Sequence, residues 1–244
     1  MTAITRIALW SGPRNISTAL MRSFGSRDDS IVVDEPFYAF YLKATGLEHP
    51  VNEEILASQP NAWQDVAAAM TGDVPEGVSV FYQKQMAHHL LPEIGREWMS
   101  GLKHAFLIRE PRAMLASYMQ KREEARLEDL GFTQQVGLYD WLKLEGSQPP
   151  PVIDSRQVLE NPRAALLALC EALGIEFQES MLTWEPGLHG TDGVWADHWY
   201  DAVRQSTGFG PYKAKDIQLT PELEAIAKEA EGYYDYLYSR RLPV

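Results

Sequence analysis

Four charged side chains stand at or just after the ends of short apolar runs that predict buried β-strands: Arg14, Glu35, Lys84 and Arg109. The runs cover residues 4–10, 31–33, 78–83 and 104–108. Helical patterns separate them, which favours a parallel sheet covered on both faces. Ligands of such sheets bind outside the carboxyl ends of the strands. We therefore expect the four charges to converge on one site.

The first of these runs continues into a segment that could bind phosphate. Ser11-Gly-Pro-Arg-Asn-Ile-Ser-Thr18 follows the strand and opens a helix predicted for 16–24. A helix N-terminus offers unpaired N–H groups and a partial positive charge. Arg14 adds a full charge, and Ser17 and Thr18 add hydroxyl donors. The alternative is an ordinary strand-to-helix turn with a surface arginine.

A second pair of polar residues, Arg109 and Ser117, lies eight residues apart. The segment Phe106-Leu-Ile-Arg-Glu-Pro-Arg-Ala-Met-Leu-Ala-Ser-Tyr118 predicts a strand, a turn and a helix over 112–126. A guanidinium fork and a hydroxyl can face one anion. A surface arginine with an unrelated helix serine is the alternative.

The phosphate loop lacks the residues of a kinase P-loop. Ser17 stands at the position of the second glycine in Gly-x-x-x-x-Gly-Lys-Ser/Thr, and Thr18 at the position of the lysine. That lysine reaches the β- and γ-phosphates of ATP. A small-molecule kinase is therefore disfavoured, and a requirement for magnesium and ATP would revive it.

Together these segments resemble the family of sulfotransferases that use 3′-phosphoadenosine 5′-phosphosulfate (PAPS). The family's Pro-Lys/Arg-Ser-Gly-Thr-Thr loop is similar to Pro13-Arg-Asn-Ile-Ser-Thr18, and its Arg-Asp-Pro-Arg-x-x-x-x-Ser segment is similar to 109–117. A third, structural segment of the family resembles 155–177. The resemblance implies a three-layer α/β/α fold with a central parallel sheet, related to P-loop NTPases, in one domain spanning 1–244.

The resemblance also implies where PAPS would bind. The 5′-phosphosulfate falls to the first loop: Gly12, Pro13, Arg14, Asn15, Ile16, Ser17 and Thr18. The 3′-phosphate falls to Arg109 and Ser117. Lys213, in the segment 206–213, is implied to touch a phosphate, with Phe209 or Tyr212 stacking on adenine. Asn15-Ile16 replace Ser-Gly of the family, and Ala19 replaces a tryptophan that stacks on adenine in many members.

Sulfonate transfer is an in-line displacement, so charge builds on the oxygen that bridges sulfur and the 5′-phosphate. Cations aimed at that oxygen lower the barrier, and Arg14 and Lys84 are the candidates. Related enzymes need no metal. The chain also shows no metal-ligand spacing beyond His88-His89.

The acceptor must lose a proton to a base. Many relatives place a histidine two residues after the strand-three lysine, but Met86 stands there. Other branches use a glutamate after strand two, and Glu35 matches it. A helix-capping role for Glu35 before Pro36 is equally open. The remaining candidates are Asp34, His88, His89 and His198, although the adjacent histidine pair suits a surface or packing role better.

The resemblance implies an enzyme that moves sulfonate from PAPS to a hydroxyl or amine of a small molecule. The tryptophan-rich stretch 184–199 would wall the acceptor site or pack the core. The altered loop keeps a second hypothesis open, namely a nucleotide-binding regulatory protein without turnover.

The composition limits the partners. The 244 residues carry a net charge of −12, which disfavours nucleic acid and anionic membranes. Cys170 is the single cysteine, which suits a reducing compartment, and no signal peptide or membrane-spanning run is evident. We expect a soluble cytoplasmic protein, and we consider a homodimer as its assembly.

The remaining elements follow from periodicity and breakers. Residues 37–75 read as mostly helical, with breaks near Pro50 and Pro60. A short strand is expected at 152–153 and an amphipathic helix over 162–173, closed by Gly174. Residues 184–215 read as irregular, and a last helix runs from 220 to about 238.

Overall fold

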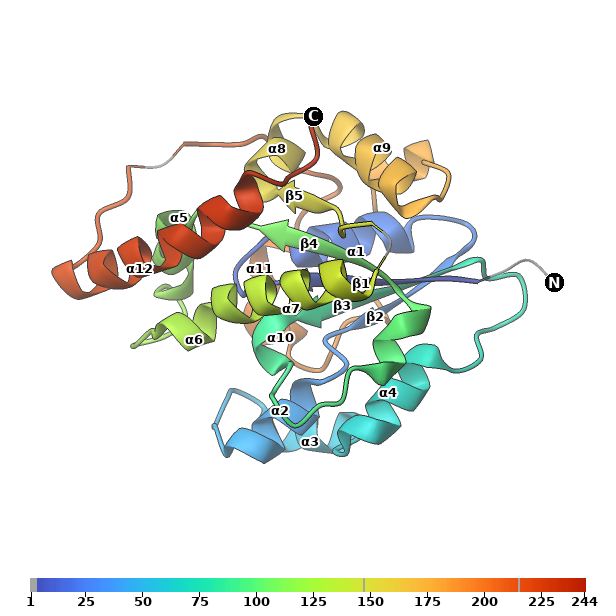
Figure 1. The fold of residues 1–244 in the computed structure, drawn as a ribbon, viewed down its shortest axis with the longest axis horizontal. Coiled ribbons are helices and arrows are strands. Elements are labelled where there is room, and N and C mark those ends of the chain that lie inside the picture. The colour runs from blue at the N-terminus through green and yellow to red at the C-terminus, as the bar shows by residue number, and fades with distance from the viewer. Residues whose placement is uncertain (1–3, 147, 215) are drawn as a thin grey trace.

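The computed structural model describes residues 4–146, 148–214 and 216–244, and a parallel sheet forms its centre (Figure 1). The strand order is β2-β3-β1-β4-β5. The strands are β1 (Thr5–Ser11), β2 (Ser30–Asp34), β3 (Val80–Met86), β4 (Lys103–Ile108) and β5 (Val152–Asp154). Each neighbouring pair is parallel, so the carboxyl ends of all five strands share one edge. The expected parallel sheet is confirmed.

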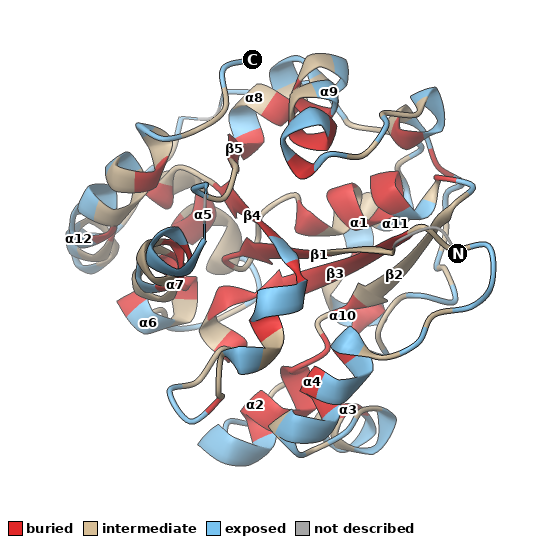
Figure 2. Ribbon diagram, turned by 45° about the vertical axis from the view of Figure 1, so that its right-hand side comes forward, coloured by how far each residue is buried: buried red, intermediate tan, exposed pale blue. Residues whose placement is uncertain are grey.

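Alternation along β1 shows how the two faces of the sheet are covered. Ile7 and Leu9 pack with α1 (Ser17–Gly25) and α9 (Pro162–Leu173). The intervening Ala8 and Trp10 face α7 (Phe132–Glu145) and α12 (Pro221–Tyr238). Successive strand side chains point to opposite faces, so an apolar run buries both sides. Figure 2 shows β1 and β3 buried between helices whose outer sides are exposed, which is the expected three-layer fold.

The remaining helices surround this sandwich. Their bounds are α2 (Tyr38–Thr45), α3 (Asn52–Ser58), α4 (Trp63–Thr71), α5 (Pro111–Tyr118), α6 (Leu127–Leu130), α8 (Ser155–Glu160), α10 (Ala196–Trp199) and α11 (Asp201–Arg204), with 3₁₀ turns at Ala87–His89, Glu97–Gly101 and Glu179–Leu182. The predictions of a broken helical region over 37–75 and of helices at 162–173 and 220–238 are confirmed. Helix α7 was not predicted from the sequence. Within the described part of the chain, no helix is long and apolar enough to span a bilayer.

Two predicted boundaries near the site are wrong. The third strand continues to Met86, so Lys84 lies inside β3 rather than at its end. Its polar residues are buried because they find partners, as when the Gln83 side chain donates to the Met70 carbonyl over 2.8 Å. The helix predicted over 112–126 ends at Tyr118. The charged run after it has no apolar stripe to bury against the fold.

Candidate active site

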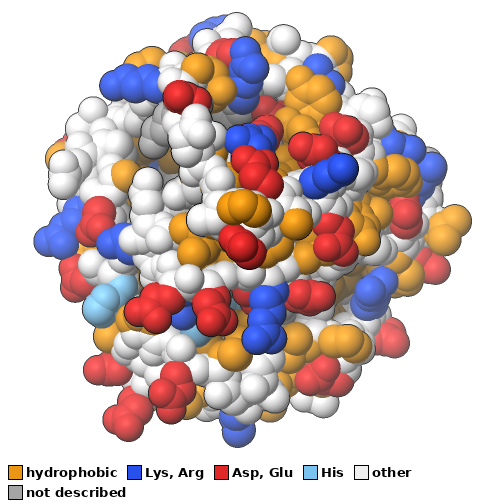
Figure 3. Space-filling view, turned by 90° about the vertical axis from the view of Figure 1, so that its left-hand side faces the viewer, with side chains coloured by type: hydrophobic (Ala, Val, Ile, Leu, Met, Phe, Trp, Pro, Cys, Tyr) orange, Lys and Arg blue, Asp and Glu red, His pale blue; other side chains and the backbone are white. Residues whose placement is uncertain are grey.

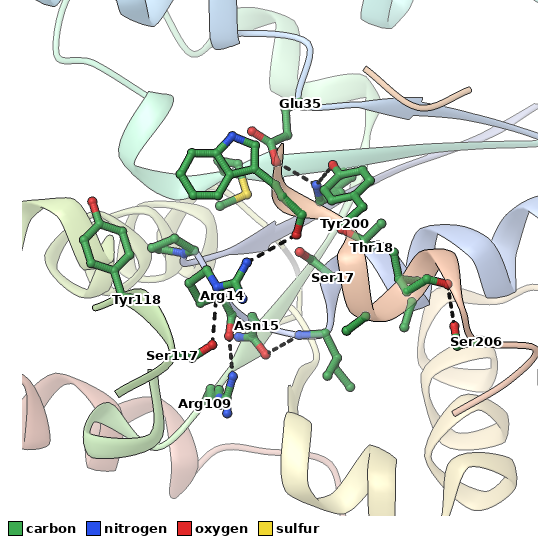
Figure 4. A pocket seen from close by; sticks show the side chains of 18 of the residues that line it. Arg14, Asn15, Ser17, Thr18, Glu35, Arg109, Ser117, Tyr118, Tyr200 and Ser206 are labelled. Carbon is green, nitrogen blue, oxygen red and sulfur yellow. Dashed lines mark hydrogen bonds and ion pairs between the residues drawn. The ribbon is translucent and has the colours of Figure 1, made fainter. Parts of the chain in front are cut away.

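A cavity of about 450 Å³ opens at the carboxyl edge of the sheet. Its walls come from the β1–α1 loop, the end of β2, β3, α5 and the segment 199–210 (Figure 4). Of the predicted residues, the lining includes Pro13, Arg14, Asn15, Ile16, Ser17, Thr18, Glu35, Lys84, His88, His89, Arg109 and Ser117. The convergence expected for the four charged residues at the strand ends is therefore present in the structure.

The two predicted phosphate motifs meet at Arg14 (Figure 4). Its Nε donates to the Ser117 hydroxyl over 3.3 Å, and the Arg109 guanidinium donates to its backbone carbonyl. The backbone of Arg14 has φ of 53°, in the left-handed region that non-glycine residues rarely adopt. Such strain is retained where surrounding contacts enforce it, and it is frequent at functional sites.

The N-terminus of α1 remains open toward the cavity. The Asn15 side chain donates to the Leu107 carbonyl over 3.2 Å and accepts from the N–H of Ile16 over 2.9 Å. No side chain caps the helix, while Ser17 and Thr18 line the cavity. The first-turn N–H groups of an uncapped helix are available to an anion. The donor set therefore fits a phosphosulfate group.

Arg14 and Arg109 are partly buried cations whose side chains form no ion pair with a carboxylate of the described residues. Loss of hydration on burial is the main cause that lowers the pKa of each guanidinium. Arginine nevertheless stays protonated near neutral pH. On the face drawn in Figure 3, lysines and arginines are scattered among acidic side chains rather than gathered in a patch. The cavity thus gathers positive charge in a way that this face does not.

Two predicted nucleotide contacts lie outside the cavity lining. A Cβ on Gly12 would come within 2.3 Å of the Leu130 carbonyl, so this glycine is required by packing behind the loop. Lys213 is exposed, and its contact with a phosphate stays a prediction. Of the two aromatic candidates, Phe209 lines the cavity, whereas Tyr212 is exposed beneath the guanidinium of Arg156.

A buried polar cluster occupies the opposite wall. The Lys84 ammonium donates to Asp34 Oδ1 over 2.8 Å, to Glu35 Oε1 over 2.7 Å and to the Tyr200 hydroxyl over 2.6 Å. An ammonium group has three donors, and here all three are used. Lys84 is 1% exposed. In this arrangement it acts as the counter-ion of the two carboxylates.

Tyr200 completes this cluster and was not among the predicted site residues. Its hydroxyl donates to Asp34 Oδ2 over 2.6 Å and accepts from the Trp195 indole over 3.1 Å. The N–H of Gly193 also donates to Asp34 Oδ2, over 3.1 Å. The signal available in the sequence was the aromatic-rich stretch, which did not indicate which ring would point inward.

Glu35 is held in place by its backbone as well as by Lys84. Its φ of 41° is left-handed, its N–H donates to the Lys84 carbonyl over 3.0 Å, and its own carbonyl accepts from Gln59 over 3.1 Å. The helix-capping alternative is wrong, because α2 begins after Phe37 without a side-chain cap. Burial raises the pKa of Glu35, Lys84 opposes that rise, and Asp34 adds to it.

The Lys84 ammonium keeps its proton despite its burial. Desolvation is the largest influence on its pKa and would lower it. The adjacent carboxylates of Asp34 and Glu35 reverse this effect, so that the pKa of Lys84 lies well above its ordinary value. The cluster therefore pairs a permanent cation with a carboxylate that can take up a proton.

The two adjacent histidines are packing residues with a side toward the cavity. The His89 ring lies between Tyr38 and Tyr41, with centroids 4.8 and 4.6 Å away. Burial lowers the pKa of His88 to about 3 and that of His89 well below its ordinary value, so both are neutral near pH 7. The surface placement that the sequence left open is wrong for this pair. His198 is exposed and does not line the cavity.

The tryptophan-rich stretch divides between the two roles considered for it. Trp184 and Trp195 are buried in the core, whereas Trp199 lines the cavity. The Trp199 carbonyl also accepts from Arg14 over 3.3 Å, which ties this stretch to the phosphate loop.

Fold and site together define a parallel α/β protein with an anion cavity at the carboxyl edge of its sheet. Residues 5–239 match the sequence profile of the sulfotransferase domain family, and the chain belongs to that family. Two of its relatives are Arabidopsis thaliana branched-chain-amino-acid aminotransferase-like proteins 1 and 2. They are 40% and 38% identical to it over 84% and 83% of the chain. The chain spans only 36% of the length of either relative.

Solved structures show the same fold at low sequence identity. A sulfotransferase from Alicyclobacillus acidocaldarius superposes with a TM-score of 0.59 at 14% identity, covering 99% of this chain and 98% of that one. The sulfotransferase domain from the curacin biosynthetic pathway superposes with a TM-score of 0.56 at 14% identity over the full length of both chains. The expected sulfotransferase fold is therefore confirmed.

Proposed function

We propose that the protein transfers a sulfonate group from PAPS to a hydroxyl or amine of a small molecule, without a metal. The observation that carries the proposal is one cavity with two chemically different walls. One wall holds Arg14 and Arg109, which form no ion pair with the residues that the structure describes, beside an uncapped helix. The other holds the buried pair of Glu35 and Lys84. The same cavity can thus bind an anion on one wall and offer a proton acceptor on the other.

The phosphate wall would bind and orient the nucleotide. Arg14 and the α1 N–H groups would hold the 5′-phosphosulfate, and Arg109 with Ser117 would hold the 3′-phosphate. The hydrogen bonds among these residues fix their positions before a ligand arrives. Preorganised donors of this kind stabilise charge that develops in a transition state. When bound, PAPS supplies an activated sulfonate with an anionic phosphate as its leaving group.

The opposite wall would handle the acceptor proton. Glu35 accepts the proton of the acceptor hydroxyl as the acceptor oxygen bonds to sulfur and the bond from sulfur to the bridging oxygen breaks. Arg14 faces the charge left on the phosphate. The Lys84 ammonium holds Glu35 and Asp34 in place, and direct donation by Lys84 to the bridging oxygen requires exchange of one of its three present contacts.

The names of the Arabidopsis relatives suggest a different chemistry, which this cavity does not favour. Aminotransferases of that kind carry pyridoxal phosphate on a lysine as a Schiff base. Lys84 lines the cavity but is kept protonated by two carboxylates, and an ammonium group is not a nucleophile. The aminotransferase name therefore carries no proposal for the residues of this chain.

Titration with 3′-phosphoadenosine 5′-phosphate (PAP) tests the nucleotide site by calorimetry, with ATP as the comparison. We expect PAP to bind, and Arg109→Ala to weaken it at least tenfold, because a charged donor to phosphate is lost. Arg163→Ala is the control, since Arg163 is exposed and pairs with Glu179 away from the cavity. Binding of neither nucleotide would refute the proposal, and preferential binding of magnesium-ATP would restore the kinase alternative.

A transfer assay with labelled PAPS separates an enzyme from a regulatory protein on the same fold. Label should pass to an acceptor hydroxyl or amine in buffer containing a metal chelator. PAP binding with no transfer to any member of a broad acceptor panel would favour the regulatory alternative. A cytoplasmic location, a homodimer and the absence of nucleic-acid and membrane partners stay predictions.

A further inference from the structure

The acceptor side of the cavity continues into a second hollow. This second cavity, of about 510 Å³, shares four lining residues with the first: His49, His88, Tyr118 and Arg122. These residues therefore lie where an acceptor would extend away from Glu35. Among the four, Arg122 is the permanent cation.

The Arg122 guanidinium lies against an aromatic ring and has no acidic partner in the described part of the chain. It lies over the Trp199 ring, 5.4 Å from the centroid. Its Nε is buried without a hydrogen-bond partner, and none of the ion pairs among the described residues includes it. A buried N–H group that makes no hydrogen bond destabilises the folded protein, unless a ligand accepts the bond. Of the other stacked arginines, Arg156 over Tyr212 and Arg163 over Phe177 each pair with a carboxylate, whereas Arg96, Arg240 and Arg241 form no ion pair among the described residues.

The rings around Arg122 are neutral and supply no competing charge. The pKa of His49 is lowered to about 4 and that of His88 to about 3, chiefly by burial. Burial likewise raises the pKa of Tyr41 to about 12 and that of Tyr38 still further, so both phenols keep their protons near neutral pH. Tyr38 and His49 are hydrogen-bonded to each other over 2.6 Å.

The acidic residues of the second cavity form no ion pair with Arg122 in the described part of the chain. Glu123 and Glu124 are exposed, and Asp129 accepts from the backbone N–H of Arg126 over 2.9 Å. The neighbouring cation, Lys121, is already paired with Asp201 over 2.7 Å. Arg122 is thus a cation on an aromatic wall whose planar fork is ready for a carboxylate.

We propose that the acceptor carries a carboxylate, which Arg122 binds while the hydroxyl or amine of the acceptor reaches Glu35. This inference rests on the proposed function. Trp199 contacts both Arg122 and Arg14 and so fixes the spacing between these two arginines: its ring lies against the Arg122 guanidinium, and its carbonyl accepts from Arg14. The carboxylate takes no part in the transfer. The substrate class is therefore small hydroxy- or aminocarboxylates, with the carboxylate as the group that distinguishes them from neutral alcohols and amines.

Matched pairs of probes test this proposal by calorimetry on the full chain saturated with PAP. The probes are 3-(4-hydroxyphenyl)propanoate and 6-hydroxyhexanoate, each compared with its primary amide. We expect at least one carboxylate to bind ten times more tightly than its amide. Arg122→Gln should bring that ratio to within about twofold, and Arg122→Lys should retain part of it. Arg163→Gln removes an arginine stacked at the same 5.4 Å and should leave the ratio unchanged.

The outcomes separate this inference from the nucleotide proposal. Equal binding of every carboxylate and its amide, or no binding of either, overturns the inference even if PAP binds. A preference for carboxylate that survives in folded Arg122→Gln, as judged by an unchanged melting temperature, also overturns it. If PAP does not bind, the proposed function fails, and the same titrations on the protein alone still measure the carboxylate preference.

Discussion

The two walls of the cavity are built in different ways. The phosphate wall comes from two contiguous segments, each a strand, a turn and a helix, whose backbone and nearby side chains line the cavity. The acceptor wall takes single side chains from β2, β3, the turn at 87–89, the end of α5 and the segment 199–203. Local sequence encodes the first wall, whereas only the folded chain assembles the second.

The walls also differ in their electrostatics. Arg14 and Arg109 have no carboxylate partners among the described residues, so that wall is prepared for charge from a ligand. Lys84 is fully paired, so the carboxylates of Asp34 and Glu35 already share a counter-ion within the cluster. Trp199 and Tyr200 join the two, since one contacts Arg14 and the other contacts Lys84.

Glu35→Gln should separate the walls most sharply. The amide keeps the shape of the side chain but cannot take a proton, so we expect transfer to fall by about 10² to 10⁴-fold. PAP affinity should stay within about twofold, because Glu35 lies on the opposite wall. Steady-state transfer and calorimetry measure the two effects. Glu93→Gln, an exposed change, is the control. Unchanged turnover in Glu35→Gln would contradict the assignment of the base.

Tyr200→Phe tests the junction between the walls. The change removes a hydroxyl that accepts from Lys84 and donates to Asp34, leaving both buried groups short of a partner. We expect the free energy of unfolding to fall by about 1–3 kcal/mol and transfer to fall with it, while PAP still binds. Urea denaturation measures the stability. Tyr233→Phe, a partly buried residue of α12 that packs against side chains of α5 and α6, is the matched control. Equal stabilities of Tyr200→Phe and wild type would show that the cluster does not depend on this hydroxyl.

The difference between the walls explains which parts of the fold and of the site could be predicted from the sequence. The parallel sheet, α9, α12 and the phosphate loops follow from short-range patterns: apolar runs, Gly174 as a helix cap, and charged residues after strands. Glu35 was found by its place after β2. Each of these signals lies within a few residues of the feature that it predicts.

The acceptor wall could not be read in this way. Tyr200 reaches Asp34 across 166 residues of sequence, and no local pattern indicates that pairing. Arg122 falls within the helix predicted over 112–126. The chain instead leaves the helix at Tyr118, which allows Arg122 to reach Trp199. Contacts of this kind depend on how the layers pack.

The smallest expected effect is the loss of stability in acid that the buried His89 of the acceptor wall causes. His89 is buried with its Nδ1 unpartnered, and burial depresses its pKa well below 6.5. Below pH 6.5 the unfolded chain therefore binds a proton at this residue that the folded chain does not. The free energy of unfolding therefore decreases as the pH is lowered below 6.5, by up to about 1.4 kcal/mol per pH unit for such a group.

His89→Phe keeps a ring between Tyr38 and Tyr41 but removes the titrating nitrogen. We expect its stability to lie within about 1 kcal/mol of wild type at pH 7 and to exceed wild type by up to about 2 kcal/mol at pH 5. Urea denaturation at the two pH values measures the difference, with exposed His198→Phe as the control. A parallel fall in both proteins would mean that His89 is protonated in the folded state. The acceptor wall would then carry an additional positive charge, and the description of its histidines as neutral would be wrong.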